Sequence, residues 1–271
     1  MSFLNPIASS PQLGVDITSL LQLSDRLHNT NGPDATWAVH TAESAGADAI
    51  VLTLSEPVST TMRANIDAVL ATMTESQLTV PLSEEMLDLV CAARPTSVCF
   101  KVGLEMQLGA TAKLDYAAVL RMIQRAVTRC DAASVRVITS IDPAQISLDQ
   151  LKQAGVMAVE FDTTHFAMAP AAGDNTELQP LQEAIAKANQ LGISVQLSRK
   201  IQYHHAAQFA ALGDVGRMNI GQAIVARAVM VGWAAAIREM KALLVASFSP
   251  VSIKNKSHTV PDQPAAIGAG C

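Results

Sequence analysis

The sequence predicts a (β/α)8 barrel, the TIM-barrel class of α/β fold. Two patterns support this prediction: eight short apolar runs typical of buried strands, and eight helical segments that alternate with them. The alternation occupies roughly 240 residues, a usual size for such a barrel. An open, doubly wound parallel sheet is the alternative, because eight units do not by themselves require the sheet to close.

The predicted strands are short and rich in β-branched residues, as is typical of strands buried on both faces. They are expected at 13–17, 48–54, 77–82, 97–102, 134–141, 156–162, 193–198 and 215–220.

Helices are predicted between these strands. They are expected at 34–46, 62–74, 83–93, 115–130, 147–154, 176–191, 203–212 and 222–247. Several have end signals. Ser83 stands before the run EEML, an N-cap followed by acidic residues in the first turn. Gly46, Gly155 and Gly192 stand at helix ends just before a strand.

The length of 271 residues suits one large domain or two small ones, and no domain boundary is evident along the sequence. Hydrophobic residues make up 49% of the chain, and the net charge of −5 favours neither nucleic acid nor an anionic membrane as a partner. The four cysteines form no C-x-x-C pair and no secretory leader is evident, so we expect reduced thiols and a cytoplasmic protein. We expect an N-terminal arm at 1–12, the barrel at 13–248 and a disordered tail at 249–271, where the sequence turns polar and aperiodic.

The turn between the last strand and the last helix suggests an anion site. It contains Asn219, Gly221 and Gln222, at the end of the barrel where phosphate is commonly bound. A helix N-terminus offers unpaired N–H groups and a partial positive charge, and glycine lets a phosphate come close. The alternative is a tight turn that needs glycine only for its conformational freedom.

Active sites of such barrels lie at the carboxyl ends of the strands, so the polar residues there are the candidates. They are Asp16, Thr18, Thr53, Ser55, Thr79, Lys101, Asp142, Glu160, Asp162, Ser198, Arg199 and Lys200.

Two of these candidates are charged residues in apolar strands. Glu160 is costly there unless it is paired or functional, and Arg136 or Arg199 would be the partner in a purely structural ion pair. Lys101 follows Phe100; it either reacts as a Schiff-base amine or extends its ammonium group to solvent.

Other charged residues leave two interpretations open. Arg199 and Lys200 suit a phosphate, or they are a solvated pair in a loop. His204 and His205 are neighbours on a predicted helix and point about 100° apart, so we interpret them as cap or surface residues. No metal site is expected, since no zinc-ligand spacing occurs.

Five stretches resemble the pyridoxine 5′-phosphate synthase family over about Leu13 to Ala246. They are AGADAIVLTLSE, SEEMLDLV, VEFDTTHFA, YHH and MNIGQAIVARAVMVGW. The resemblance implies a phosphate-binding barrel that forms a homo-oligomer, an octamer built from dimers. It also implies a condensation of 1-deoxy-D-xylulose 5-phosphate with 3-amino-2-oxopropyl phosphate, with no metal or organic cofactor.

The sequence departs from the family pattern where proton transfer takes place. The family's second-strand catalytic His and phosphate-binding Arg correspond to Thr53 and Ser55 here, and its third-strand Glu corresponds to Thr79. A further catalytic His, on the seventh strand, corresponds to Arg199, and the His after Asn-Ile-Gly corresponds to Gln222.

Glu160 is the retained catalytic candidate, and Gly221 is retained in the phosphate turn. The first strand ends with Asp16 and Thr18 where the family has Asn-Ile-Asp-His, and both remain candidates for binding substrate. Thr and Ser cannot transfer protons near neutral pH as His and Glu do. The sequence therefore predicts a barrel that binds a phosphorylated ligand with impaired or lost ring closure. The alternatives are an active divergent synthase and a different enzyme that uses Lys101, Glu160 or Asp162.

Overall fold

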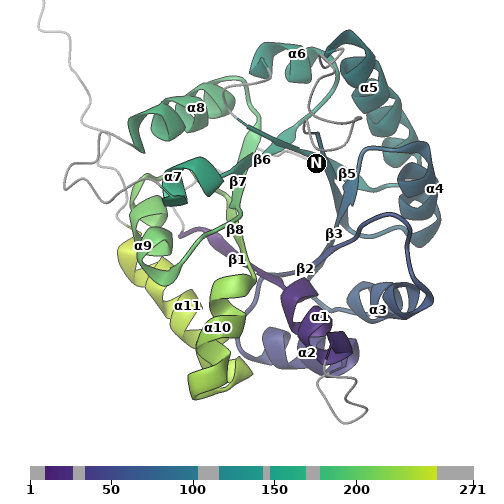
Figure 1. Cartoon of the computed structure of the whole chain (residues 1–271). Coiled ribbons are helices and arrows are strands. Elements are labelled where there is room, and N and C mark those ends of the chain that lie inside the picture. The colour runs from purple at the N-terminus through teal and green to yellow at the C-terminus, as the bar shows by residue number, and fades with distance from the viewer. Residues whose placement is uncertain (1–9, 27–33, 103–115, 143–146, 169–177, 249–271) are drawn as a thin grey trace, which may run out of the picture.

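The computed structural model describes residues 10–26, 34–102, 116–142, 147–168 and 178–248. Eight parallel strands follow one another around a closed barrel, with helices outside (Figure 1). The strands are β1 (Gln12–Asp16), β2 (Ala49–Thr53), β3 (Glu75–Pro81), β4 (Ser97–Lys101), β5 (Arg136–Ile141), β6 (Ala158–Asp162), β7 (Ser194–Ser198) and β8 (Arg217–Ile220). The barrel closes where β1 pairs with β8, Gly14 opposite Asn219. The predicted (β/α)8 barrel is confirmed, and the open sheet is excluded.

Helices alternate with the strands as predicted, and several carry the expected caps. They are α1 (Thr18–Arg26), α2 (Ala35–Ser44), α3 (Thr60–Leu70), α4 (Glu84–Ala93), α5 (Tyr116–Ala132), α6 (Leu148–Gln153), α7 (Thr164–Met168), α8 (Gln179–Gln190), α9 (Tyr203–Ala211), α10 (Gln222–Val231) and α11 (Trp233–Ser247). Ser83 caps α4 as predicted, since its Oγ accepts a 3.2 Å hydrogen bond from the N–H of Met86. Asp34 caps α2 in the same way, through the N–H of Trp37 at 2.7 Å.

Two short helices were not predicted. The first, α1, follows β1, and α7 follows β6. Each follows an aspartate at the end of the preceding strand, which accepts a hydrogen bond from the backbone N–H of the first helical residue: Asp16 from Thr18 at 2.9 Å and Asp162 from Thr164 at 2.8 Å. These local turns start a helix without the long apolar periodicity on which the prediction relied.

The prediction of one helix over 222–247 is wrong. The helix breaks at Gly232, whose φ of 87° and ψ of 156° belong to a region that is nearly specific to glycine. After the break, Trp233 Nε1 donates to Ala38 O in α2 at 3.2 Å, and Tyr203 Oη in α9 donates to Ala236 O at 2.9 Å. The break therefore lets α11 pack against two neighbouring helices.

Some predicted boundaries shift. The first strand begins at Gln12, inside the expected arm, and β3 begins at Glu75, two residues before its prediction. The last strand begins at Arg217 instead of residue 215. Residues 1–9 of the expected arm and the expected tail at 249–271 lie outside the described residues.

Apolar side chains pack mainly between the strands and the helices. Phe100, Phe161 and Phe209 are among the largest fully buried side chains of this outer core. The barrel interior holds a separate, small apolar cluster of Cys99, Ile138 and Ala158. Successive strand residues face opposite sides of the sheet, so the polar residues that alternate with the outer core face inward.

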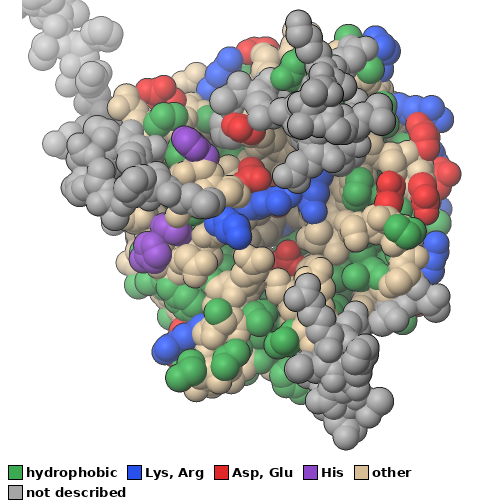
Figure 2. All heavy atoms as spheres, viewed as in Figure 1, with side chains coloured by type: hydrophobic (Ala, Val, Ile, Leu, Met, Phe, Trp, Pro, Cys, Tyr) green, Lys and Arg blue, Asp and Glu red, His purple; other side chains and the backbone are tan. Residues whose placement is uncertain are grey.

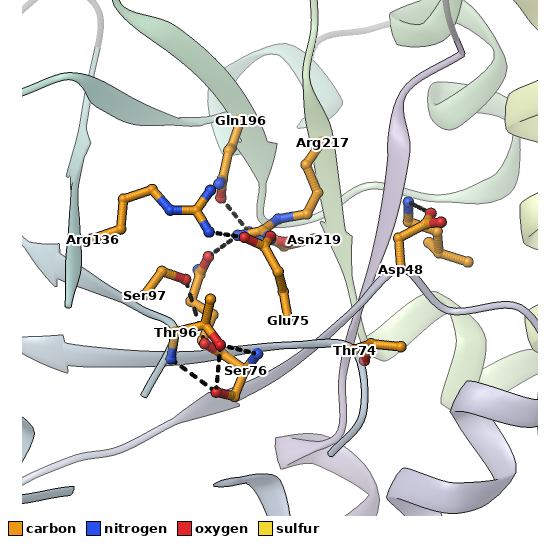
Figure 3. Close-up of polar contacts among 12 residues, drawn as sticks. Asp48, Thr74, Glu75, Ser76, Thr96, Ser97, Arg136, Gln196, Arg217 and Asn219 are labelled. Atoms are coloured by element: carbon orange, nitrogen blue, oxygen red, sulfur yellow. Dashed lines mark hydrogen bonds and ion pairs between the residues drawn. The ribbon is translucent and has the colours of Figure 1, made fainter. Parts of the chain in front are cut away.

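Polar side chains fill the amino-terminal half of the barrel. Arg136 and Arg217, at the starts of β5 and β8, both extend toward Glu75 and pair with its carboxylate (Figure 3). The Arg217 guanidinium also donates to Gln77 Oε1. Arg217 is only 2% exposed, and this burial lowers its pKa to about 10. The amino-terminal half is therefore closed by a hydrogen-bonded ion-pair network.

Candidate functional site

A cavity of about 480 Å³ lies at the carboxyl ends of the strands. Figure 2 shows this end of the barrel, where lysine and arginine side chains lie across a central hollow with acidic side chains close by. The structure brings most of the predicted candidates into its lining: Asp16, Thr18, Thr53, Thr79, Lys101, Glu160, Asp162, Ser198, Arg199, Lys200, Gly221 and Gln222. Ser55 and Asp142 do not line the cavity, and both are exposed beyond the ends of their strands.

Glu160 is held at the floor of the cavity by neutral donors. One carboxylate oxygen accepts a 2.8 Å hydrogen bond from Ser198 Oγ. The other accepts from Asn219 Nδ2 at 2.6 Å and from Gln77 Nε2 at 3.5 Å. These donors come from β7, β8 and β3, so the barrel itself orients the carboxylate. Glu160 is 4% exposed.

The predicted alternative for Glu160, an ion pair with Arg136 or Arg199, is wrong. Arg136 pairs with Glu75 at the other end of the barrel. Arg199 lies 3.3 Å from Asp162, measured from Nε to Oδ2. Hydrogen bonds from uncharged groups satisfy Glu160 instead, so neither arginine neutralises its charge.

Asp16 lies at the end of β1, where its carboxylate accepts hydrogen bonds from the start of α1 and from β2. One oxygen accepts from the N–H of Thr18, and the other accepts from Thr53 Oγ1 at 3.3 Å. Burial raises the pKa of the Asp16 carboxyl above its ordinary value, although these hydrogen bonds act in the opposite direction.

Gly221 stands where α10 begins against β1. A Cβ atom at this position would lie 2.6 Å from the backbone oxygen of Asp16. The φ of Gly221 is −125°, so a left-handed conformation is not what requires glycine here. Close backbone packing is the requirement, and it places the N-terminus of α10 directly beside the cavity.

Arg199 and Lys200 follow β7 in unusual backbone conformations. Both have left-handed φ values, 72° and 52°, although neither is glycine. Thr163 supports this turn, since its Oγ1 lies 2.6 Å from Arg199 O and 3.0 Å from Ser198 O and donates to this pair of carbonyls. Such strain persists only where surrounding contacts enforce it, and it concentrates at functional sites. Here it directs two consecutive cationic residues to one cavity.

The two neighbouring histidines lie outside the cavity lining, at the start of α9. His205 Nδ1 accepts a 3.3 Å hydrogen bond from the N–H of Gln202, so His205 is a helix cap as predicted. Burial and the nearby His204 lower the pKa of His205. Within the described residues, no three His, Cys, Asp or Glu side chains are grouped to hold a metal ion.

Residues 13–246 match the family model of pyridoxal phosphate biosynthesis protein PdxJ. The chain belongs to this family. The predicted resemblance is thereby confirmed over nearly the whole barrel.

Solved structures share the fold at low identity. A tryptophan synthase from M. tuberculosis is 12% identical, with a TM-score of 0.58, over 87% of this chain and 93% of that one. A 4-hydroxy-2-oxoglutarate aldolase is 16% identical, with a TM-score of 0.54, over 89% and 99%. A mutant tryptophan synthase α-subunit from Pyrococcus furiosus is 10% identical, with a TM-score of 0.54, over 88% and 98%. At such identities the likeness concerns the barrel alone. In the part of the chain that the structure describes, no helix is both long and apolar enough to cross a membrane.

Asn219 and Gly14 shape this PdxJ-family cavity, although no sequence motif marks either of them as a site residue. Asn219 was noted only as part of a turn, yet it donates to Glu160 and to Gln196 Oε1, the latter at 3.0 Å. A Cβ atom at Gly14 would lie 2.0 Å from Asn219 Oδ1, so that glycine makes room for the amide. The available signal was the alternation of polar with apolar residues along β3 and β8, which marks side chains facing the barrel interior.

Proposed function

We propose that this PdxJ-family chain binds a phosphorylated small molecule at the carboxyl end of the barrel and does not close the pyridine ring. The observation that supports binding is the convergence of Arg199 and Lys200 on one cavity beside the N-terminus of α10. Guanidinium, ammonium and helix N–H groups are the donors that phosphate oxygens prefer.

The residues that line the same cavity are the reason to expect that ring closure is lost. Thr53, Thr79 and Arg199 line it where the family resemblance implies two catalytic histidines and a glutamate. Glu160 remains as an acid–base group, but a multistep condensation needs several proton transfers at different atoms. Replacing one such group costs about 10²–10⁴-fold in rate, and replacing several together removes the mechanism.

Ligand binding is tested by thermal unfolding of the purified full chain with inorganic phosphate and with each family substrate. A ligand at 100 times its Kd should stabilise the chain by about 2.7 kcal/mol. Arg199→Gln should weaken binding about 10- to 100-fold, because one charge-assisted hydrogen bond is lost. Arg238→Gln is the matched control. Arg238 is exposed on α11 and does not line the cavity, so its substitution removes the same charge away from the site. Equal effects of the two substitutions would overturn the proposed site.

Ring closure is tested by incubating the chain with both family substrates and measuring pyridoxine 5′-phosphate. We expect none above background. Product that forms with the wild type and disappears in Glu160→Ala would overturn this part of the proposal and favour an active, divergent synthase.

A further inference from the structure

Lys101 is the last residue of β4, and its side chain enters the cavity from the barrel wall. The preceding residue, Phe100, is fully buried in the outer core, so the alternation of the strand turns Lys101 inward. Lys101 itself is half-buried. A lysine in this position brings its amine to the reacting end of the barrel on a rigid strand rather than on a loop.

The charged groups around Lys101 are already engaged with other partners. Asp16 accepts from Thr18 and Thr53, and Glu160 accepts from Ser198, Asn219 and Gln77. Arg199 pairs with Asp162. Among the ion pairs of the described residues, none within 4.0 Å involves Lys101, whereas Lys187 and Lys241 each pair with an aspartate.

This environment makes the Lys101 ammonium group easier to deprotonate than that of an exposed lysine. Burial lowers the pKa of Lys101, and the positive charge of Arg199 lowers it further, while the carboxylates of Asp16 and Glu160 act in the opposite direction. Burial together with Glu160 raises the pKa of the neighbouring Cys99 thiol, so that group stays protonated beneath the amine. A lysine that loses its proton more readily is a better nucleophile than an exposed one.

We propose that Lys101 is a nucleophilic amine that forms an imine with the carbonyl carbon of a phosphorylated aldehyde or ketone bound in this cavity. This inference rests on the proposed function, because Arg199, Lys200 and the start of α10 would hold the phosphate while the carbonyl faces Lys101.

The reaction balances without an external oxidant or reductant. The lone pair of Lys101 Nζ attacks the carbonyl carbon and forms a C–N bond, while the carbonyl π electrons move to oxygen, which takes up a proton. The nitrogen gives up one of its two protons, which leaves a neutral carbinolamine. The carbinolamine hydroxyl then takes up a proton and leaves as water, and the nitrogen loses its remaining proton, so that a C=N bond forms and one water is released. Asp16 and Glu160, which line the same cavity and whose charges act on Lys101, would accept and return these protons.

The test is borohydride trapping on the full chain with dihydroxyacetone phosphate, and with dihydroxyacetone as the probe without phosphate. After reduction of the imine, the modified lysine is heavier by the mass of the ligand less one oxygen. Peptide mapping then identifies which lysine is modified. We expect the phosphorylated probe to modify Lys101 at least about tenfold more than Lys187, because a bound carbonyl meets the amine at a high effective concentration. Lys187 is exposed on α8 and provides the internal comparison.

Three variants make the result specific. Lys101→Met and Lys101→Arg should both lose the adduct, and Lys187→Met should keep it. Lys101→Arg keeps the positive charge, so its thermal stabilisation by inorganic phosphate should persist and show that the variant is folded.

Two failures are distinguishable. If phosphate stabilises the chain but Lys101 is modified no more than Lys187, the nucleophile is overturned while the anion site stands. If phosphate does not stabilise the chain, the proposed function fails. A selective adduct of Lys101 with dihydroxyacetone would then still support the nucleophile.

Discussion

Single residues carry most of the chemistry of this cavity, and their roles depend on partners that no motif displays. A carboxylate in an apolar strand is costly unless it has partners, and Glu160 has three of them. Its partners were predicted wrongly, since Ser198, Asn219 and Gln77 lie on three other strands. The pairing of inward-facing side chains depends on how the strands are staggered around the barrel, which a linear sequence does not give.

Asp16 gives a pH-dependent prediction. Its pKa is raised in the folded state, so the folded chain holds this proton more tightly than the unfolded chain. The corresponding stability is fully present below the unfolded pKa, near 3.8, and is lost as pH rises through the folded value. Once it is ionised, the Asp16 carboxylate therefore costs stability. Asp16→Asn, which resembles the protonated acid, should raise the Tm at pH 7, and the difference should vanish below pH 3.8.

Asp162→Asn is the matched control for this prediction. Asp162 accepts the same kind of turn hydrogen bond, from Thr164, but it also pairs with Arg199. Its replacement removes an ion pair and should not raise the Tm. If Asp16→Asn lowered the Tm at every pH, the stabilisation by hydrogen bonds to the ionised carboxylate would exceed the cost of burying its charge.

At the level of elements, periodicity predicted every strand and the main helices, because each must bury an apolar face. It failed where a local turn decides the structure. The short helices α1 and α7 depend on aspartate turns, and the end of α10 depends on one glycine. Ala-rich sequence on both sides of Gly232 suggested a continuous helix, since a single glycine is tolerated inside a helix at a cost of only about 1 kcal/mol.

The break at Gly232 can be tested by Gly232→Ala. A Cβ atom there would meet nothing within 4 Å, so the cost comes from the backbone conformation alone. We expect a loss of about 1–3 kcal/mol in the free energy of unfolding, measured by chemical denaturation. The ion pair between Arg227 in α10 and Glu239 in α11, at 2.7 Å, should be weakened with it. An unchanged free energy would mean that α10 and α11 can join into the continuous helix that the sequence suggested.

For the whole molecule, the two ends of the barrel have different roles. The carboxyl end holds the cavity and its cations, whereas the amino end is filled by Glu75, Arg136 and Arg217. In barrels of this class the first end serves function and the second serves stability. The closed barrel and the location of the cavity could be predicted from alternation and strand ends. The interior network could not, because Glu75, Arg136 and Arg217 start three different strands and meet only after the barrel closes.

This division predicts that Arg217→Met lowers stability and leaves anion binding intact. The Arg217 side chain is 3% exposed, and its removal leaves Gln77 and part of the Glu75 carboxylate unpaired in the interior, which should cost about 3 kcal/mol. Arg136→Met is the control on the same carboxylate. Because the Arg136 side chain is 39% exposed, its loss should cost only about 1 kcal/mol.

Denaturant unfolding measures both costs, and inorganic phosphate should stabilise both variants as much as it stabilises the wild type. Equal losses in the two variants would show that burial does not govern the strength of this network. A loss of phosphate stabilisation in Arg217→Met alone would show that the network extends through Gln77 and Glu160 to the cavity, since Gln77 contacts both Arg217 and Glu160. The two ends of the barrel would then be coupled, and stability and binding could not vary independently in this fold.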